Sequence, residues 1–99
     1  MLNIAKNIEG KKAEIILEGR LDTVTAPELE TLLKEHIDGL EELVLNFENL
    51  DYISSAGLRI LLSSQKKMNR QGEMKVVNVN ETIMEIFEVT GFTDILTIE

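Results

Sequence analysis

Two short segments near the start of the chain, Asn3–Ile8 and Lys12–Glu18, carry apolar residues in a strand-like pattern. The residues between them, Glu9-Gly10-Lys11, form a hairpin-type turn signal, because glycine tolerates the positive φ that such a turn needs. The two segments are therefore predicted to pair as antiparallel strands.

Three later segments place their apolar residues at helical spacing: one between Thr25 and Gly39, one over Ser55–Gln71, and one between Asn80 and Gly91. Thr25 is predicted to cap the first helix with its hydroxyl group, since proline and glutamate follow at the positions typical of a helix start. Asn80 is predicted to cap the third helix, and Gly39 and Gly91 to end the first and third.

Three further segments are predicted strands: the buried run Leu43–Phe47, then Met74–Val79, and an edge strand at Asp94–Ile98. The order ββαβαβαβ predicts an α/β fold, a mixed sheet of four or five strands with helices packed mainly on one side. Residues 1–99 are expected to form a single domain, since the chain is short and contains no linker-like segment.

The two longest predicted connections are Gly19–Val24 and Glu48–Ser54. Each follows the carboxyl end of a predicted strand. Open α/β sheets place their functional sites at that end of the strands, so we expect the site to lie between these two connections.

Cysteine is absent and the formal net charge is −8 at pH 7. The first fact excludes disulfides, thiolate metal sites and cysteine nucleophiles. The second disfavours nucleic acid and anionic membrane surfaces as partners and favours a basic or mixed-charge protein, although an acidic surface can serve solubility alone. No signal pattern begins the chain and no apolar run approaches about 18 residues, so a soluble, cytoplasmic monomer is expected.

The segment Asp51–Arg59 is the most informative part of the sequence, because it presents two hydroxyl groups where a strand leads into a helix. The first backbone N–H groups of a helix lack partners within the helix, and a serine oxygen or a phosphate satisfies them. Two readings follow. Ser54 or Ser55 is an N-cap worth about 1 kcal/mol, or one of them carries a phosphate.

The residues Asn46-Phe47-Glu48-Asn49-Leu50-Asp51-Tyr52-Ile53-Ser54-Ser55-Ala56-Gly57-Leu58 look like the signature of STAS-domain anti-sigma factor antagonists. The resemblance extends to Gly19-Arg20-Leu21-Asp22, to the turn at Gly72 and to Val89-Thr90-Gly91-Phe92. It therefore covers essentially the whole chain.

This resemblance implies a function and a set of site residues. Ser55 matches the serine that is phosphorylated in such regulators. Its neighbour Ser54 is the alternative acceptor. The implied partners are an anti-sigma factor that is itself a serine kinase, and a serine phosphatase. The resemblance implies that this chain binds the anti-sigma factor only while its serine is unphosphorylated. Two residues depart from the family pattern: Ser54 replaces a frequent aspartate, and Arg59 replaces a small residue. The expected partner-binding residues are Asp22, Asp51, Ser54, Ser55, Gly57, Leu58 and Arg59.

Other functions have less support from the sequence. The main alternative is a constitutive STAS scaffold, for example a subunit of a transport or signalling complex. Asp22 and Asp51 resemble a paired-carboxylate site, but catalysis needs a further positioned group, and none is identified, so we expect no enzyme activity. His36 is the only histidine, and without a second His or Cys it does not suggest a metal site. No cofactor is expected.

Overall fold

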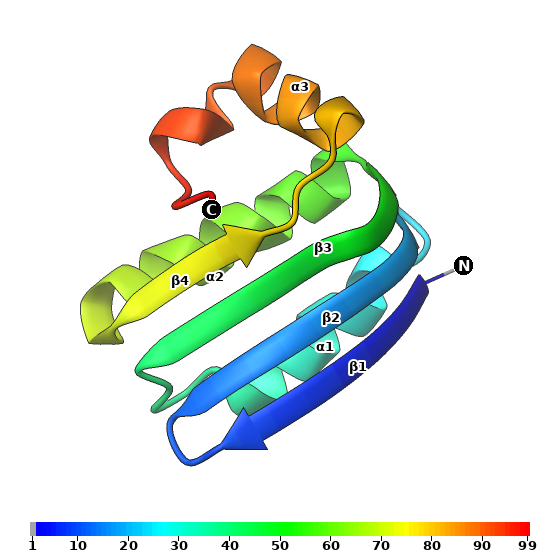
Figure 1. Cartoon of the computed structure of the whole chain (residues 1–99). Helices are drawn as coiled ribbons and strands as arrows, with labels where there is room; N and C mark the ends of the chain where they lie inside the picture. Colours follow the sequence, from blue (N-terminus) through cyan, green and yellow to red (C-terminus); the bar gives the residue numbers. More distant parts are fainter. Residues whose placement is uncertain (1) are drawn as a thin grey trace.

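The structure of the chain, a computed structural model, describes residues 2–99. They form four strands, three α-helices and a short 3₁₀ helix, η1 (Figure 1). In chain order the elements are β1 (Leu2–Glu9), β2 (Lys12–Leu21), α1 (Ala26–His36), β3 (Glu42–Ile53), α2 (Ser55–Gln71), β4 (Glu73–Val77), α3 (Glu81–Thr90) and η1 (Phe92–Asp94). The hairpin and the bounds of the second helix are as predicted.

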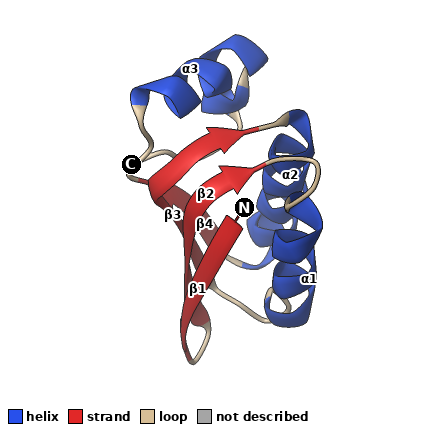
Figure 2. Ribbon diagram, turned by 90° about the vertical axis from the view of Figure 1, so that its right-hand side faces the viewer, coloured by secondary structure: helices blue, strands red, loops and turns tan. Residues whose placement is uncertain are grey.

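The strands form one mixed sheet in the order β1-β2-β3-β4. β1 pairs antiparallel with β2, whereas β2, β3 and β4 are parallel to one another. Helices α1 and α2 lie side by side against one face of the sheet, and α3 lies apart from them (Figure 2). The predicted mixed sheet with helices mainly on one side is confirmed, with four strands.

The core lies between the sheet and the two paired helices. Alternate residues of the central strands point into it, because successive side chains of a strand face opposite sides. On β2 these are Ala13, Ile15 and Leu17, and on β3 they are Leu43, Leu45 and Phe47, each at most 1% exposed. Leu29 and Leu33 of α1 and Leu61 and Met68 of α2 pack from the other side.

The two predicted connections are shorter than expected. β3 continues to Ile53 through most of the segment 48–54, and β2 continues to Leu21. The register between the two strands shifts between Ile16 and Glu18 and again between Gly19 and Arg20. Such β-bulges bend a strand without ending it, so the alternation is broken while pairing continues. Leu50 and Ile53 stay 1% exposed and anchor the extended strand.

The predicted edge strand at Asp94–Ile98 is wrong. Gly91, with φ +81°, turns the chain into η1, and only Ile98 forms a single parallel bridge, to Val76. Packing explains the difference: the Phe92 ring lies 6.4 Å from the ring of Phe87, and Leu96 is buried. This segment therefore closes the core beside β4 as a compact turn.

The two predicted helix caps have different outcomes. The Asn80 side chain accepts a hydrogen bond from the backbone N–H of Ile83 at 2.8 Å, so this cap is confirmed. Thr25 precedes α1, but its hydroxyl makes no cap hydrogen bond; it donates instead to the Arg20 carbonyl oxygen at 2.8 Å. α1 also ends at His36, before Gly39.

Candidate functional site

The carboxyl ends of β2 and β3 meet at one end of the sheet. Leu21 and Ile53 are direct partners in the parallel pairing. The backbone N–H of Ser54 then donates to the Leu21 carbonyl oxygen at 2.9 Å. The loop 22–25 and the first turn of α2 consequently start from neighbouring positions (Figure 1). This arrangement was expected from strand polarity alone.

Asp22 organises the loop that follows β2. Its carboxylate accepts hydrogen bonds from the backbone N–H groups of Val24, at 3.0 Å, and Thr25, at 3.1 Å. The Thr25 hydroxyl in turn accepts from the Asp22 N–H at 2.9 Å. Arg20 Nε lies 3.8 Å from the second carboxylate oxygen. The loop is therefore held by its own side chains, and Val24 is left 84% exposed.

These contacts lower the pKa of Asp22 below its usual value; the largest cause is the N–H of Thr25, and the Thr25 hydroxyl, the Val24 N–H and Arg20 add to it. A carboxyl group with a lowered pKa in the folded state stabilises the fold above its unfolded pKa, and the stabilisation is lost as pH falls through the folded value.

Asp22→Asn is therefore expected to lower the free energy of unfolding at about pH 7 and to have a smaller effect at about pH 3. Urea unfolding at both pH values measures this difference. Asp51→Asn is the matched control, because Asp51 is exposed on β3. A stability difference between wild type and Asp22→Asn that does not shrink in acid would contradict the role given to this carboxylate.

The two adjacent serines have different environments. Ser54 is the N-cap residue of α2, but its side chain makes no cap hydrogen bond, and its Oγ is buried without a partner. Ser55 is the first residue of the helix and is exposed. Of the two hydroxyl groups, only that of Ser55 is open to another protein.

Gly57 lies where α2 packs against the ends of β2 and β3. A Cβ atom at this position would lie 2.7 Å from Ile53 Cγ1 and 2.8 Å from Leu21 Cγ. Contacts this short do not occur between real side chains, so only glycine fits without movement of its neighbours. The next residue, Leu58, is also buried. These two residues position the first turn of α2; neither offers much surface to a partner.

The remaining predicted site residues, Asp51 and Arg59, are exposed, and Arg59 has no carboxylate within ion-pair distance among residues 2–99. Sequence reasoning missed Arg20 and Tyr52, which pair across the strands with the guanidinium 4.5 Å from the ring centre. The parallel register of β2 and β3 brings these two side chains together, and a sequence does not show that register. It also missed Val24, an apolar residue in a polar loop.

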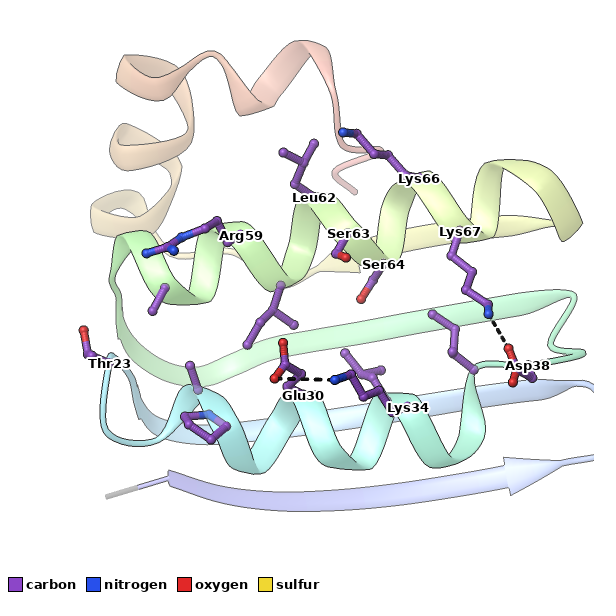
Figure 3. Close-up of a pocket in the computed structure, with 16 residues that line it drawn as sticks. Thr23, Glu30, Lys34, Asp38, Arg59, Leu62, Ser63, Ser64, Lys66 and Lys67 are labelled. Carbon is purple, nitrogen blue, oxygen red and sulfur yellow. Dashed lines mark ion pairs between the residues drawn. The ribbon is translucent and has the colours of Figure 1, made fainter.

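A groove of about 880 Å³ lies between α1 and α2 (Figure 3). Thr23, Ala56 and Arg59 line it near the start of α2, so this end adjoins the site. Near the end of α1, Lys67 of α2 forms an ion pair with Asp38 across the helices. Leu33, Ile37 and Ile60 are among its apolar lining residues.

Within residues 2–99, no three His, Asp or Glu side chains converge so that they can hold a metal ion. The helices in that range are all too short or too polar to cross a membrane. The site presents a loop held by its own hydrogen bonds, an exposed serine at a helix start and an adjoining groove.

Comparison with known proteins gives a consistent result. The STAS domain family matches residues 4–99. The anti-sigma-B factor antagonist of Staphylococcus aureus (strain NCTC 8325 / PS 47) is 34% identical over 97 residues, covering 96% of this chain and 90% of that protein. Among solved structures, unphosphorylated SpoIIAA aligns with a TM-score of 0.77 at 17% identity, over 98% of this chain and 87% of that chain. An anti-sigma factor antagonist from Mycobacterium paratuberculosis aligns with a TM-score of 0.89 at 21% identity, over 99% and 85%. These two structures share the fold.

Proposed function

Because the chain belongs to the STAS-domain family of anti-sigma factor antagonists, we propose that it is a binding module switched by phosphorylation of Ser55. The unphosphorylated form binds an anti-sigma factor that is also a serine kinase, and thereby releases a sigma factor. Phosphorylation of Ser55 ends this binding, and a serine phosphatase restores it. The cytoplasm is the compartment that this function requires.

The observation that carries the proposal is the contrast between the two serines. Ser55 is exposed at the start of α2, whereas the Oγ of Ser54 is buried. A kinase must bring the acceptor hydroxyl to its bound nucleotide, and only Ser55 offers that hydroxyl without opening the fold. The family pattern points to the same residue, although Ser54 stands where many members have aspartate.

The position of Ser55 also favours a switch that leaves the fold intact. A phosphate adds about −1.5 to −2 charges at pH 7, and the N-terminus of a helix stabilises an anion by roughly 0.3–1 kcal/mol. Arg59 lies one turn along α2 and is free to form a charge-assisted pair with the phosphate. The phosphate therefore changes the surface that a partner meets rather than the core.

An affinity capture experiment tests the proposal. The immobilised chain is incubated with lysate of its source cells, with or without ATP, and both the captured proteins and the phosphorylated residues are identified by mass spectrometry. We expect an anti-sigma factor that is captured without ATP and lost after phosphorylation. Capture of a transport complex that is indifferent to Ser55 would instead support the constitutive scaffold.

Val24 is expected to contribute to the same interface. Its side chain is 84% exposed and is presented by the loop that Asp22 holds beside the start of α2. Valine buries more apolar carbon than alanine, at roughly 0.8 kcal/mol per carbon, so Val24→Ala should weaken binding to the anti-sigma factor about tenfold. Isothermal titration calorimetry measures the effect.

Val89→Ala is the matched control for this prediction, because Val89 is 83% exposed but lies on α3. Both variants should melt within about 2 °C of wild type, since exposed substitutions change stability little. Equal affinities for the Val24 and Val89 variants would remove the loop from the interface.

A further inference from the structure

Helix α2 is basic within an acidic chain. Its 17 residues include Arg59, Lys66, Lys67 and Arg70 and no aspartate or glutamate, whereas the whole chain has a net charge of −8. The contrast with α3 is clear, since that helix contains three glutamates and no lysine or arginine. Four of the ten lysines and arginines of the chain therefore lie on the helix that begins at Ser55, and no acidic residue of that helix offsets them.

Three of these cations form a row, which we call the α2 ridge: Arg59, Lys66 and Arg70. Positions seven and four apart lie on the same side of a helix, and the row is about 16 Å long at 1.5 Å per residue. All three are exposed, and none has a carboxylate within 4.0 Å among residues 2–99. Lys67, by contrast, is paired with Asp38.

The ridge adjoins apolar surface. Leu62 lies between Arg59 and Lys66 on α2 and is only half-buried, and all three line the groove of about 880 Å³. Figure 3 shows Lys66 and Leu62 pointing away from α1, whereas Lys67 points toward Asp38. An incoming helix can therefore meet a row of unpaired cations and an apolar side chain at once.

We propose that the α2 ridge and the adjoining groove bind an acidic amphipathic helix of the anti-sigma factor. This inference rests on the proposed function and adds the chemistry of the partner. Charge complementarity carries it, because unpaired cations beside apolar surface select carboxylates flanking apolar residues. The net charge of the whole chain had favoured a basic or mixed-charge partner, but the distribution of charge favours an acidic segment at this surface.

The inference also explains how a phosphate on Ser55 acts. Ser55 lies one turn before Arg59, at the N-terminal end of the ridge. A phosphate there repels an acidic helix and competes with it for Arg59. Binding is then weakened by like-charge contact, with no change of fold.

The first test uses the intact chain and a synthetic helical peptide of about 16 residues, long enough to cover the ridge. The peptide carries leucine at helical spacing and glutamate at the flanking positions, and a second peptide has lysine in place of glutamate. Binding is followed by ¹H–¹⁵N NMR shifts. We expect shifts along α2 with the glutamate peptide only, and affinity that falls as salt rises from about 50 to about 300 mM.

Charge reversal on the ridge provides the matched pair of variants. Lys66→Glu should weaken binding of the glutamate peptide, and of the anti-sigma factor, by about tenfold or more. Lys12→Glu makes the same change of charge on β2, where residue 12 faces away from the helices, and should alter affinity by less than about twofold. It also breaks the exposed Lys12–Glu42 ion pair, which costs little stability. Circular dichroism melts confirm that both variants fold.

The outcomes separate this inference from the proposed function. Equal loss of affinity in the two variants, or equal binding of the lysine peptide, overturns the acidic-helix site. If Ser55→Asp releases the anti-sigma factor while Lys66→Glu binds it as wild type does, the acidic-helix site is wrong and the switch stands. If Ser55→Asp binds as tightly as wild type, the switch itself is wrong.

Discussion

Gly57→Val should lower the free energy of unfolding by about 3 kcal/mol, at the upper end of the usual cost of overpacking a core. The added Cβ would meet Ile53 Cγ1 at 2.7 Å and Leu21 Cγ at 2.8 Å. Neither neighbour can move aside easily, because both side chains are at most 1% exposed and end paired strands. For a domain of this size the melting temperature should fall by roughly 12–24 °C.

The helix propensities of glycine and valine act against this loss of stability. Glycine is a poorer helix former than valine, so a valine in an unobstructed helical position should cost nothing or stabilise the helix slightly. Ser63→Val, at an exposed position of the same helix, is the control and should shift stability by less than about 0.5 kcal/mol. Similar melting temperatures for both variants would show that the helix does not need glycine at residue 57.

Ser55→Asp should weaken binding to the anti-sigma factor by roughly 10²–10³-fold, or about 3–4 kcal/mol. The end of β3 that leads into Ser55 already carries two exposed acidic residues, Glu48 and Asp51. A further negative charge in the interface costs several kcal/mol unless the partner pairs it. The fold should be unaffected, since Ser55 is exposed and a helix N-terminus favours an anion.

Binding and melting together distinguish this mechanism from a general effect of charge. Ser55→Ala should bind constitutively, in the presence or absence of ATP. Thr82→Asp places the same charge in the first turn of α3, where Thr82 is also exposed, and should leave the affinity unchanged within about twofold. A large loss of affinity in Thr82→Asp, or a lowered melting temperature in Ser55→Asp, would contradict a local switch.

The parts of the fold with strong local signals were predictable. α2 begins at Ser55 and ends before Gly72 as expected, because its apolar period is long and glycine commonly follows the end of a helix. The errors fall where tertiary contacts override local pattern. The bulges that extend β3, and the packing of Phe92 on Phe87 in place of a last strand, are not encoded by any period of the sequence.

At the site, too, some features follow from local sequence signals and others depend on tertiary contacts. Strand polarity and the family pattern place Asp22 and Ser55 at one end of the sheet, and the structure brings their segments together through the Ser54–Leu21 hydrogen bond. The internal partners of Asp22 and the burial of the Ser54 hydroxyl depend on how the loop and helix settle in three dimensions. Val24 has no local signal at all, because a single valine in a loop becomes informative only when its exposure is known.

Phosphate mapping tests the claim that Ser55 is the switch most directly. Wild type, Ser54→Ala and Ser55→Ala are each incubated with the anti-sigma factor kinase and ATP, and the modified residue is identified by tandem mass spectrometry. We expect phosphate on Ser55 in wild type and in Ser54→Ala, and none in Ser55→Ala. Phosphate found only on Ser54, or full phosphorylation of Ser55→Ala, would contradict the assignment.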